Sequence, residues 1–268
     1  LGSRLGLPLD LVHQPVLPAA MPLTLLSRRD HGAEVQAPSA ILRFGIPRTS
    51  LWQRLTGTGF ARFVAGDLIG VVPQGSTMPR FYSLASGAAD GFIEIVVRRQ
   101  PGGLCSGQLT QLEPGQTALA FLKPNPGFRL AAGKAPVILI GAGSGIGPLA
   151  GFIRANAAGR AMHLFFGMRH AASDFLYGEE LQQWHEQGRL ASLVTAASRG
   201  KRPHHVQDAL RAEAADVLQL ITQGARIMVC GGRDMAAGVS EALAGILAPA
   251  GLTPAMLRAE GRYLEDVY

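Results

Sequence analysis

The pattern of apolar residues changes character near the middle of this 268-residue chain, and that change constrains the fold most. As far as residue 122, apolar residues fall in short runs broken by Gly, Pro, Ser and Asp, which is typical of antiparallel strands. From residue 137 onward, brief apolar runs alternate with longer helical patterns, which is typical of a parallel sheet. We therefore expect two domains: an antiparallel β-barrel over residues 21–130, and an α/β doubly wound parallel-sheet domain over residues 131–268.

Each half contains enough short segments to build its sheet. Because closure removes the edges of a sheet, six strands in the first half predict a closed or Greek-key barrel. These strands are expected at Leu23–Leu26, Ala40–Ile46, Asp67–Val72, Arg80–Leu84, Phe92–Arg98 and Thr117–Leu122. The parallel strands are expected at Val137–Ile140, Met162–Phe166, Leu193–Ala196 and Arg226–Cys230. Helices are expected at Cys105–Leu112, Pro148–Ala157, Phe175–Gln187, Val206–Gln223 and Asp234–Leu247.

The composition is that of a globular protein, with 47% hydrophobic and 16% charged residues. The uncharged run 135–153 is long enough to span a bilayer. Its five glycines and Pro148 favour a strand, a loop and a helix start instead, so no membrane segment is expected. Residues 1–20 lack the basic-then-apolar order of a signal peptide and predict a linker or extended arm.

Most of the positive charge lies in the first half of the chain. Residues 1–130 hold 12 Lys and Arg against 7 Asp and Glu, whereas residues 131–268 hold 13 against 12. The excess predicts an anionic cofactor or an acidic protein partner. Nucleic acid is not expected, because no run of Lys and Arg is interleaved with aromatics. The only cysteines, Cys105 and Cys230, lie far apart, which favours reduced thiols, a cytoplasmic location and no metal site.

A glycine-rich segment, Gly141–Pro148, lies between a predicted strand and a predicted helix. Its glycines alternate, so the strict G-x-G-x-x-G pattern is not met. Glycine still lets the backbone approach a pyrophosphate, and the following helix offers free N–H groups. Gly143, Ser144 and Gly145 are therefore candidate phosphate-binding residues, and a turn kept for tight packing is the alternative.

Cations follow the next two strands of the second half. The acidic residue that would hold a ribose hydroxyl is absent, and Arg169 follows the strand in its place. Ser198, Arg199 and Lys201 follow the third strand. A hydroxyl and clustered cations suit a 2′-phosphate, which favours NADP(H) over NAD(H), and a solvated basic loop is the alternative.

The segment Arg80-Phe-Tyr-Ser83 places an arginine beside a tyrosine on a predicted strand. Alternation predicts Arg80 and Tyr82 on one face, with Phe81 and Ser83 on the other. A guanidinium suits a phosphate and a phenol ring suits a flat heterocycle. Tyr and Arg also share a strand face for purely structural reasons, so this segment alone decides little.

Five motifs occur in order: R-x-Y-S at 80–83, G-x-x-S at 103–106, G-x-G-x-G-x-G-P at 141–148, C-G-G at 230–232 and a terminal aromatic. Together they resemble the ferredoxin–NADP reductase superfamily, most closely the FAD/NADP module of cytochrome P450 reductase and sulfite reductase flavoprotein. Further matches to that group are Phe165-Phe-Gly167, Asp174-Phe-Leu-Tyr177, Ser198-Arg199, Val206-Gln207 and Arg262–Tyr268. The helical connecting insertion of that group is absent, because Asp67 and Arg80 lie close together.

The resemblance implies a flavin site in the barrel. Arg80 would hold the flavin phosphate, Tyr82 would stack on the isoalloxazine, and Ser83 would lie near its reactive nitrogen. Phe81 completes that motif. The backbone of Gly103, Leu104, Cys105 and Ser106, with the Ser106 hydroxyl, would cap the pyrophosphate. FAD is the expected flavin. FMN is the less favoured alternative, because Arg98-Arg99-Gln100-Pro101 stands where an adenine-stacking aromatic is often found.

The resemblance also implies a nicotinamide site. Ser198 and Arg199, helped by Lys201, would take the 2′-phosphate, with Gln207 near the adenosine. Tyr268 would cover the second flavin face and step aside for the nicotinamide. Ser83, Cys230 and Asp266 would surround the hydride-transfer point, where positioning matters more than acid–base chemistry.

We therefore expect a flavoprotein oxidoreductase of the diaphorase type. It would move a hydride from NADPH to FAD and then pass electrons to a protein or haem acceptor. The basic first half favours an acidic redox partner such as a flavodoxin-like domain, in the same longer chain or at the cytoplasmic face of a membrane. A non-catalytic redox sensor is the alternative, although it would not need Cys230, Asp266 and Tyr268. A thiol hydrolase using Cys230 lacks a histidine partner.

Overall fold

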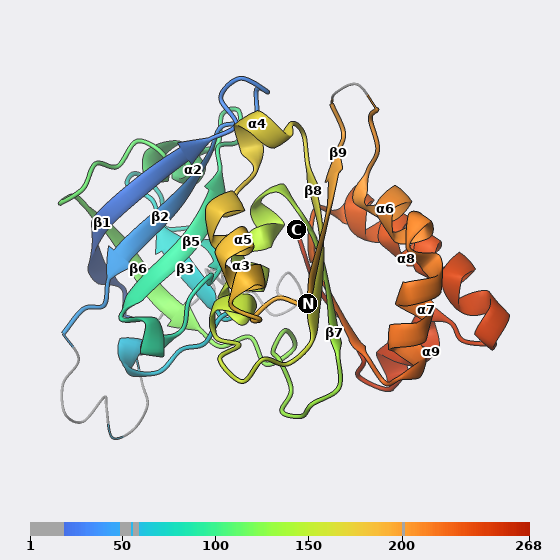
Figure 1. Cartoon of the computed structure of the whole chain (residues 1–268). Helices are drawn as coiled ribbons and strands as arrows, with labels where there is room; N and C mark the ends of the chain where they lie inside the picture. The colour runs from blue at the N-terminus through green and yellow to red at the C-terminus, as the bar shows by residue number, and fades with distance from the viewer. Residues whose placement is uncertain (1–18, 49–54, 56–58, 200–201) are drawn as a thin grey trace, which may run out of the picture.

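The computed structural model describes residues 19–48, 55, 59–199 and 202–268, and within them two sheets lie side by side (Figure 1). The first sheet is antiparallel and has the order β4-β3-β6-β1-β2-β5. Its strands are β1 (Met21–His31), β2 (Ser39–Gly45), β3 (Leu68–Val72), β4 (Arg80–Ser83), β5 (Phe92–Arg98) and β6 (Thr117–Lys123). The short helix α2 (Leu104–Leu109) and the 3-10 turns η2 (Gly59–Ala61) and η3 (Ala88–Asp90) complete this part.

The first sheet closes on itself. Its edge strands β4 and β5 meet just beyond β4, where Leu84 pairs antiparallel with Ile95 and the Ala85 N–H donates to the Glu94 carbonyl at 2.8 Å. Leu84 and Ile95 are both fully buried in the barrel core. Closure removes the strand edges, so the predicted antiparallel barrel is confirmed.

The second sheet is entirely parallel and has the order β11-β10-β7-β8-β9. Its strands are β7 (Val137–Ala142), β8 (Met162–Met168), β9 (Ser192–Ala197), β10 (Arg226–Gly231) and β11 (Tyr263–Val267). Its helices are α3 (Ile146–Arg154), α4 (Ala171–Asp174), α5 (Gly178–Glu186), α6 (Val206–Ala212), α7 (Ala214–Thr222), α8 (Arg233–Leu247) and α9 (Pro254–Ala259), with 3-10 turns η4 (Gly143–Gly145) and η5 (Ala248–Ala250). The predicted doubly wound domain is therefore confirmed.

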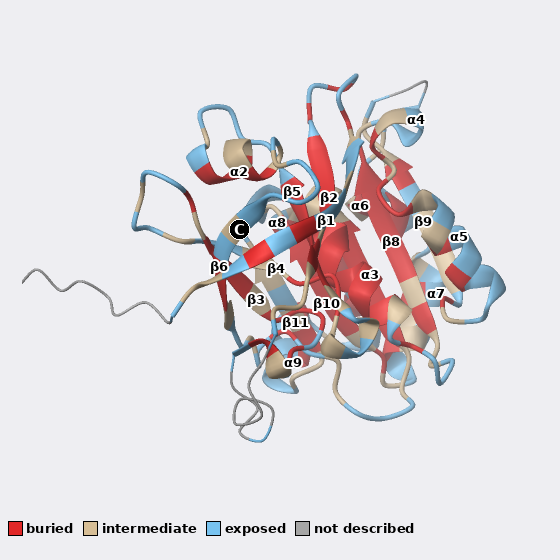
Figure 2. Ribbon diagram, turned by 90° about the vertical axis from the view of Figure 1, so that its left-hand side faces the viewer, coloured by how far each residue is buried: buried red, intermediate tan, exposed pale blue. Residues whose placement is uncertain are grey.

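The helices divide between the two faces of the parallel sheet. Helices α3 and α5 lie between this sheet and the barrel, and α6 to α9 cover the far face (Figure 1). Chain order reverses between β7 and β10, since the chain moves from β7 toward β9 and later returns to add β10 and β11 on the other side. Ligands of open α/β sheets bind outside the carboxyl ends of the strands at such a reversal. Figure 2 shows β8 and α3 as continuous buried ribbons, unlike the exposed loops around them.

The alternating side chains of β5 serve both domains. Ile93, Ile95 and Val97 pack in the barrel core, whereas Glu94 and Val96 point toward the nucleotide half. The Glu94 carboxylate is fully buried, and Arg154 of α3 donates to its Oε1 at 2.5 Å. Because successive strand residues face opposite sides, one strand supplies core to the barrel and contacts to its neighbour.

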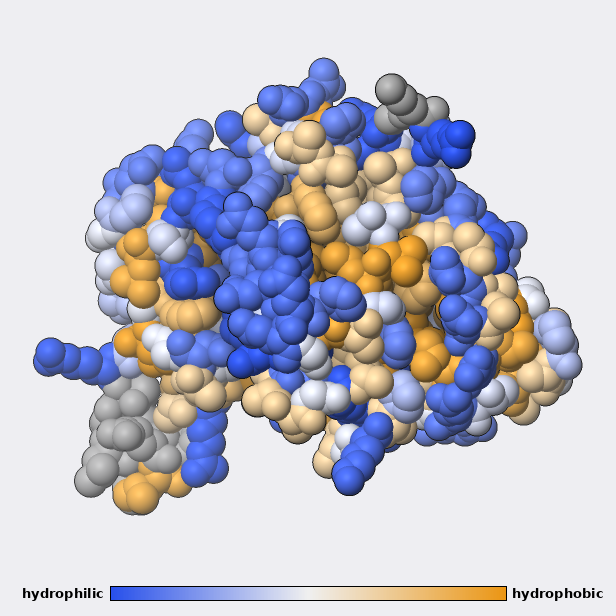
Figure 3. Space-filling model, viewed as in Figure 1, coloured by the Kyte–Doolittle hydropathy of each residue, from blue (hydrophilic) through white to orange (hydrophobic). Residues whose placement is uncertain are grey.

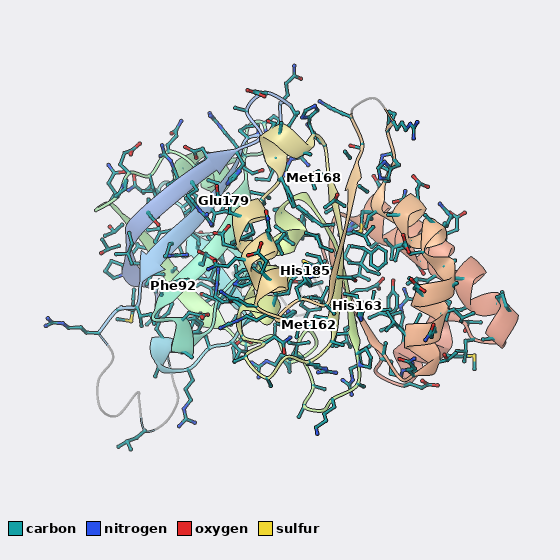
Figure 4. All side chains as sticks on the ribbon, in the orientation of Figure 1. Phe92, Met162, His163, Met168, Glu179 and His185 are labelled. Atoms are coloured by element: carbon teal, nitrogen blue, oxygen red, sulfur yellow. The ribbon has the colours of Figure 1, made fainter. Side chains whose placement is uncertain are left out.

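Arg43 and Tyr177 complete the contacts of the Glu94 carboxylate. Arg43 donates to Oε2 at 2.8 Å, and the Tyr177 hydroxyl donates to Oε1 at 3.0 Å. The guanidinium of Arg43 also lies 3.9 Å from the centre of the Phe92 ring, labelled in Figure 4 with Glu179 and His185 of α5. Two cations and a hydroxyl thus bind one buried carboxylate at the boundary between the halves, which we call the Glu94 cluster.

The surface seen in Figure 3 is hydrophilic over the barrel and α5, with apolar side chains over the parallel sheet. In the described residues no helix is long and apolar enough to cross a bilayer. Within that same part of the chain, no three His, Cys, Asp or Glu side chains gather as a metal site would require.

Four elements differ from expectation. The predicted helix Val206–Gln223 is wrong as one helix, because the backbone breaks at Glu213 (φ −100°, ψ 26°) and gives α6 and α7. Strand β1 is longer than predicted and continues through polar residues to His31, because β2 pairs with it there. Strand β11 and helix α9 were not predicted from the apolar pattern.

Candidate active site

Two cavities adjoin between the barrel and the carboxyl ends of the parallel strands. The first, about 590 Å³, lies over β4 and the start of α2. The second, about 430 Å³, lies at the ends of β7, β8 and β9. Four residues line both cavities: Arg98, Gln100, Ser144 and Tyr268. Both volumes fall in the range of cofactor pockets, so two ligands would meet at this shared wall.

Strand β4 contributes its whole length to the first cavity. Arg80, Tyr82 and Ser83 line it, and burial raises the pKa of the Tyr82 phenol. Phe81 also lines the cavity, while its ring meets Phe121 edge-on at 6.0 Å on the barrel side. All four residues of the strand thus line this cavity, although alternation predicts two faces. Ser83 ends the strand, and its hydroxyl reaches across to Asp266.

The segment 103–106 forms another wall of the first cavity. Gly103 precedes α2, and a Cβ there would lie 2.6 Å from the Ser106 hydroxyl. Ser106 Oγ accepts from the Gln100 N–H at 3.1 Å and donates to the Gly103 carbonyl at 3.3 Å. Leu104 is exposed at the rim and Cys105 is buried. The Ser106 hydroxyl therefore stabilises the turn that presents the backbone.

The glycine-rich loop serves two different purposes. Gly143 lines the second cavity with a positive φ of 54°, and a Cβ there would meet nothing within 4 Å. A Cβ at Gly145 would lie 2.1 Å from the Cys230 carbonyl oxygen, and Gly145 lines neither cavity. Gly143 thus leaves room for a ligand, whereas Gly145 permits close packing of the loop on β10.

Ser83, Cys230 and Asp266 come together where the two domains meet. Cys230 and Asp266 are partners in the register of β10 and β11. The Ser83 hydroxyl donates to Asp266 Oδ2 at 2.5 Å, and the Cys230 thiol lies 3.9 Å from the same oxygen. Burial raises the pKa of the Asp266 carboxyl, although both hydrogen bonds oppose this. Burial, followed by the Asp266 charge, raises the pKa of the Cys230 thiol, which disfavours a thiolate nucleophile.

Tyr268, the last residue, forms part of both cavity walls. Its N–H donates to the Gly231 carbonyl at 3.2 Å. Its hydroxyl lies 2.6 Å from the Ser144 hydroxyl, and 58% of the residue is exposed. The aromatic side chain is thus held at one end by the backbone and at the other by Ser144.

The second cavity gathers most of the predicted nucleotide residues. Gly143, Ser144, Arg169, Ser198 and Gln207 all line it. Lys201 lies outside the described residues. These side chains come from the ends of β7, β8 and β9 and the start of α6, as a nucleotide site at the reversal point of the sheet requires.

Arg199 does not line the second cavity. Its guanidinium donates to the Val35 carbonyl at 3.0 Å, and Arg169 donates to the same oxygen at 2.8 Å. Val35 lies in the turn between β1 and β2, and this turn contacts the nucleotide half. There the Gly32 N–H donates to the Ser173 carbonyl at 2.9 Å. A partner distant in sequence therefore binds the Arg199 guanidinium beside that of Arg169, next to the lining of the second cavity.

Arg98 and Gln100 line both cavities, although the sequence marked their segment only for its lack of an adenine-stacking aromatic. Arg98 ends β5 and brings a cation to the junction of the two cavities. Burial, together with the charges of Arg98 and Arg199, lowers the pKa of Arg169, so the cations lie close to one another. The sequence showed the pair Arg98-Arg99 at the end of a strand. It did not show which cavity the side chain of Arg98 would face.

The residues present fit a flavin and a nucleotide. The first cavity offers a cation at Arg80, a ring at Tyr82 and a backbone turn at Gly103. The second offers the open loop at Gly143, where a Cβ would fill free space, and the cation Arg169. Phosphates, a flat ring and a second nucleotide match this set of groups.

Comparisons with known proteins agree with this geometry. Residues 139–241 match the family model described as the oxidoreductase NAD-binding domain. The chain is 37% identical over 215 residues to the sulfite reductase [NADPH] flavoprotein alpha-component of Salmonella typhi, covering 71% of this chain and 36% of that protein. It is 36% identical over 233 residues to the same component of Citrobacter koseri, covering 78% and 38%.

The chain therefore spans little more than a third of the length of these relatives. The comparisons support the predicted cofactors, a flavin and a nicotinamide nucleotide. With its antiparallel barrel, its parallel nucleotide sheet and these relatives, the chain belongs to the ferredoxin–NADP reductase superfamily.

Proposed function

We propose that this chain is an NADPH-dependent flavin reductase that moves a hydride from NADPH to FAD and then electrons to a protein or haem acceptor. The observation that carries the proposal is the wall shared by the two cavities, with Ser83, Cys230 and Asp266 at its edge. Hydride transfer requires two rings in near contact, and two adjoining cavities supply that arrangement. Bound flavin would supply the chemistry of accepting a hydride and releasing single electrons.

The barrel residues position the flavin in this proposal. Arg80 binds its phosphate, and Tyr82 covers one face of its ring. The turn at Gly103–Ser106 presents backbone groups to the pyrophosphate. Ser83 lies at the ring edge, where its hydroxyl is oriented by Asp266. The residues 21–130 would thus form the flavin domain and the residues 131–268 the NADP domain.

The nucleotide residues set the choice of donor. Ser198 and Arg169 line the second cavity and would hold the 2′-phosphate, with Gln207 near the adenosine. Arg199, which shares the Val35 carbonyl with Arg169, would join them at the 2′-phosphate. The Asp266 carboxyl contacts both Ser83 and Cys230, so its charge would stabilise a positive nicotinamide ring.

An acidic redox protein is the proposed acceptor. The relatives carry the name sulfite reductase [NADPH] flavoprotein alpha-component, and this chain covers little more than a third of each. The charge excess in residues 1–130 would attract an acidic flavodoxin-like domain, on the same chain or on another.

Reduction of ferricyanide tests the proposal. The purified protein should be yellow, retain FAD rather than FMN, and reduce ferricyanide with NADPH. A colourless protein that takes up no flavin and shows no reduction would refute it. A protein that binds both cofactors without turnover would instead be a redox sensor. Equal rates with NADH would overturn only the 2′-phosphate assignment.

A further inference from the structure

The Ser144 hydroxyl lies at the boundary between the two cavities and contacts the hydroxyl of Tyr268, which also lines both. It belongs to the loop that leaves room for a ligand at Gly143, and it lines both cavities. Its Oγ lies 2.6 Å from the Tyr268 hydroxyl, although 124 residues separate the two in sequence. One side chain of the nucleotide loop therefore fixes the C-terminal aromatic.

We propose that Ser144 is a positioning residue that latches Tyr268 between the cavities and so raises the free energy of nicotinamide entry. The proposal rests on the function proposed above. A nucleotide that only fills the second cavity would leave the latch intact. A nucleotide whose nicotinamide must reach the flavin has to displace Tyr268, and that displacement breaks the hydrogen bond to Ser144.

The contacts of Tyr268 support a latch that opens locally. Its backbone N–H is bound by the Gly231 carbonyl, so the end of the chain stays attached to β10. In the described part of the chain, the contact with Ser144 is the one hydrogen bond of its side chain, and no aromatic ring stacks on it. More than half of the residue is exposed, so solvent is available on the open side. Rotation of the side chain is therefore opposed mainly by one hydroxyl pair.

The chemistry of the pair predicts how much the latch matters. Loss of a neutral hydrogen bond changes an equilibrium constant by about two- to tenfold. Removing it should therefore improve the affinity for a complete nucleotide by about that factor. The affinity for a nucleotide without nicotinamide should not change, because that ligand leaves Tyr268 in place.

Tyr268→Phe isolates the latch, since it keeps the ring and removes only the hydroxyl. We would measure the dissociation constants of NADP⁺ and of 2′-phospho-ADP-ribose by calorimetry on the flavin-loaded protein. The variant should bind NADP⁺ about two- to tenfold more tightly, and it should bind 2′-phospho-ADP-ribose like the wild type. The change in flavin absorbance on adding NADP⁺ should also grow, because the nicotinamide contacts the flavin more often.

Ser144→Ala closes a double-mutant cycle. This variant loses any phosphate contact of Ser144, which the binding of 2′-phospho-ADP-ribose measures separately. In its background, Tyr268→Phe should have no further effect on NADP⁺ affinity. An equal gain from Tyr268→Phe with and without Ser144, or no gain at all, would overturn the latch. If neither ligand binds any variant, the proposed function itself fails together with it.

Discussion

The Ser83 hydroxyl donates a 2.5 Å hydrogen bond to Asp266 and thereby joins the barrel to the last strand of the nucleotide domain. The two residues are 183 positions apart, at the end of β4 and near the end of β11. Cys230 contacts the same carboxylate oxygen from the neighbouring strand. The edge of the shared cavity wall is thus built by both domains, so its geometry depends on how they pack.

The titration of Asp266 should make the stability of the folded protein depend on pH. Burial raises the pKa of this carboxyl above its ordinary value, so the folded chain binds a proton where the unfolded chain has already lost it. Stability from this group is therefore present at low pH and falls as pH rises through the raised pKa. The melting temperature of the wild type, minus that of Asp266→Asn, should decrease as pH rises above about 4, the ordinary pKa of an aspartate.

Asp208 provides a control of opposite sign. The His205 backbone N–H, followed by the charge of Arg211, lowers the pKa of this exposed carboxyl. The advantage of the wild type over Asp208→Asn should therefore increase as pH rises through about 4. Identical pH profiles for the two variants would contradict the assignment for Asp266.

The glycine at 145 should not tolerate a side chain. In Gly145→Ala the new Cβ would meet the Cys230 carbonyl at 2.1 Å, so the phosphate loop or β10 must shift. We expect a lower melting temperature and at least tenfold weaker NADP⁺ binding, since a loop shift of about 1 Å removes precise contacts. Gly245→Ala in α8 is the matched control, because nothing lies within 4 Å there and alanine should stabilise the helix by about 0.5–1 kcal/mol. Wild-type binding in Gly145→Ala would refute the packing argument.

Breaking the Glu94 cluster should strongly lower the free energy of unfolding. Glu94→Gln removes the charge that Arg154 and Arg43 share, and leaves a mostly buried guanidinium without its counter-ion. We expect a loss of about 3 kcal/mol in the free energy of unfolding, measured with urea. Glu113→Gln removes an exposed partner of Arg28 and should cost about 0–1 kcal/mol. Comparable losses in both variants would mean that burial of Glu94 carries no special weight.

Arg169 and Arg199 should differ in their effect on the choice of coenzyme. Arg169 lines the second cavity, whereas Arg199 does not. Arg169→Ala should lower the NADPH-to-NADH ratio of kcat/KM by about tenfold or more, because a charged hydrogen bond is lost. Arg199→Ala should have a smaller effect on that ratio. A larger effect from Arg199→Ala would show that its guanidinium leaves Val35 when the nucleotide binds.

Local patterns predicted the regular elements well where packing follows the pattern. The strand Phe92–Arg98 has the predicted bounds, because its β-branched residues alternate between two buried faces. Residues Ser27–Asp30 of β1 are polar and carry no strand signal. They are extended because β2 pairs with them, and that partner is set by the tertiary fold.

The candidate site was also predictable only where a local motif marks its residues. Motif order identified residues that meet in the structure, such as Ser83 and Asp266 at the edge of the shared wall. Arg199 has its partner 164 residues away, and no local pattern encodes that contact. Glu94 reads in the sequence as one polar residue in a strand, and only the arrival of Arg154 and Tyr177 explains why its carboxylate can be buried.

The shared carboxylate of Glu94 limits how the two halves can be exchanged by recombination. A cut between β6 and β7 separates Glu94 and Arg43 from Arg154 and Tyr177. A chimera with the second half of another superfamily member would keep Arg43 beside the buried Glu94 carboxylate, but would lose Arg154 and the Tyr177 hydroxyl unless that half supplied equivalents. The chain can be cut here without dividing a sheet, but Glu94 and its two partners from the second half, Arg154 and Tyr177, would have to be exchanged together.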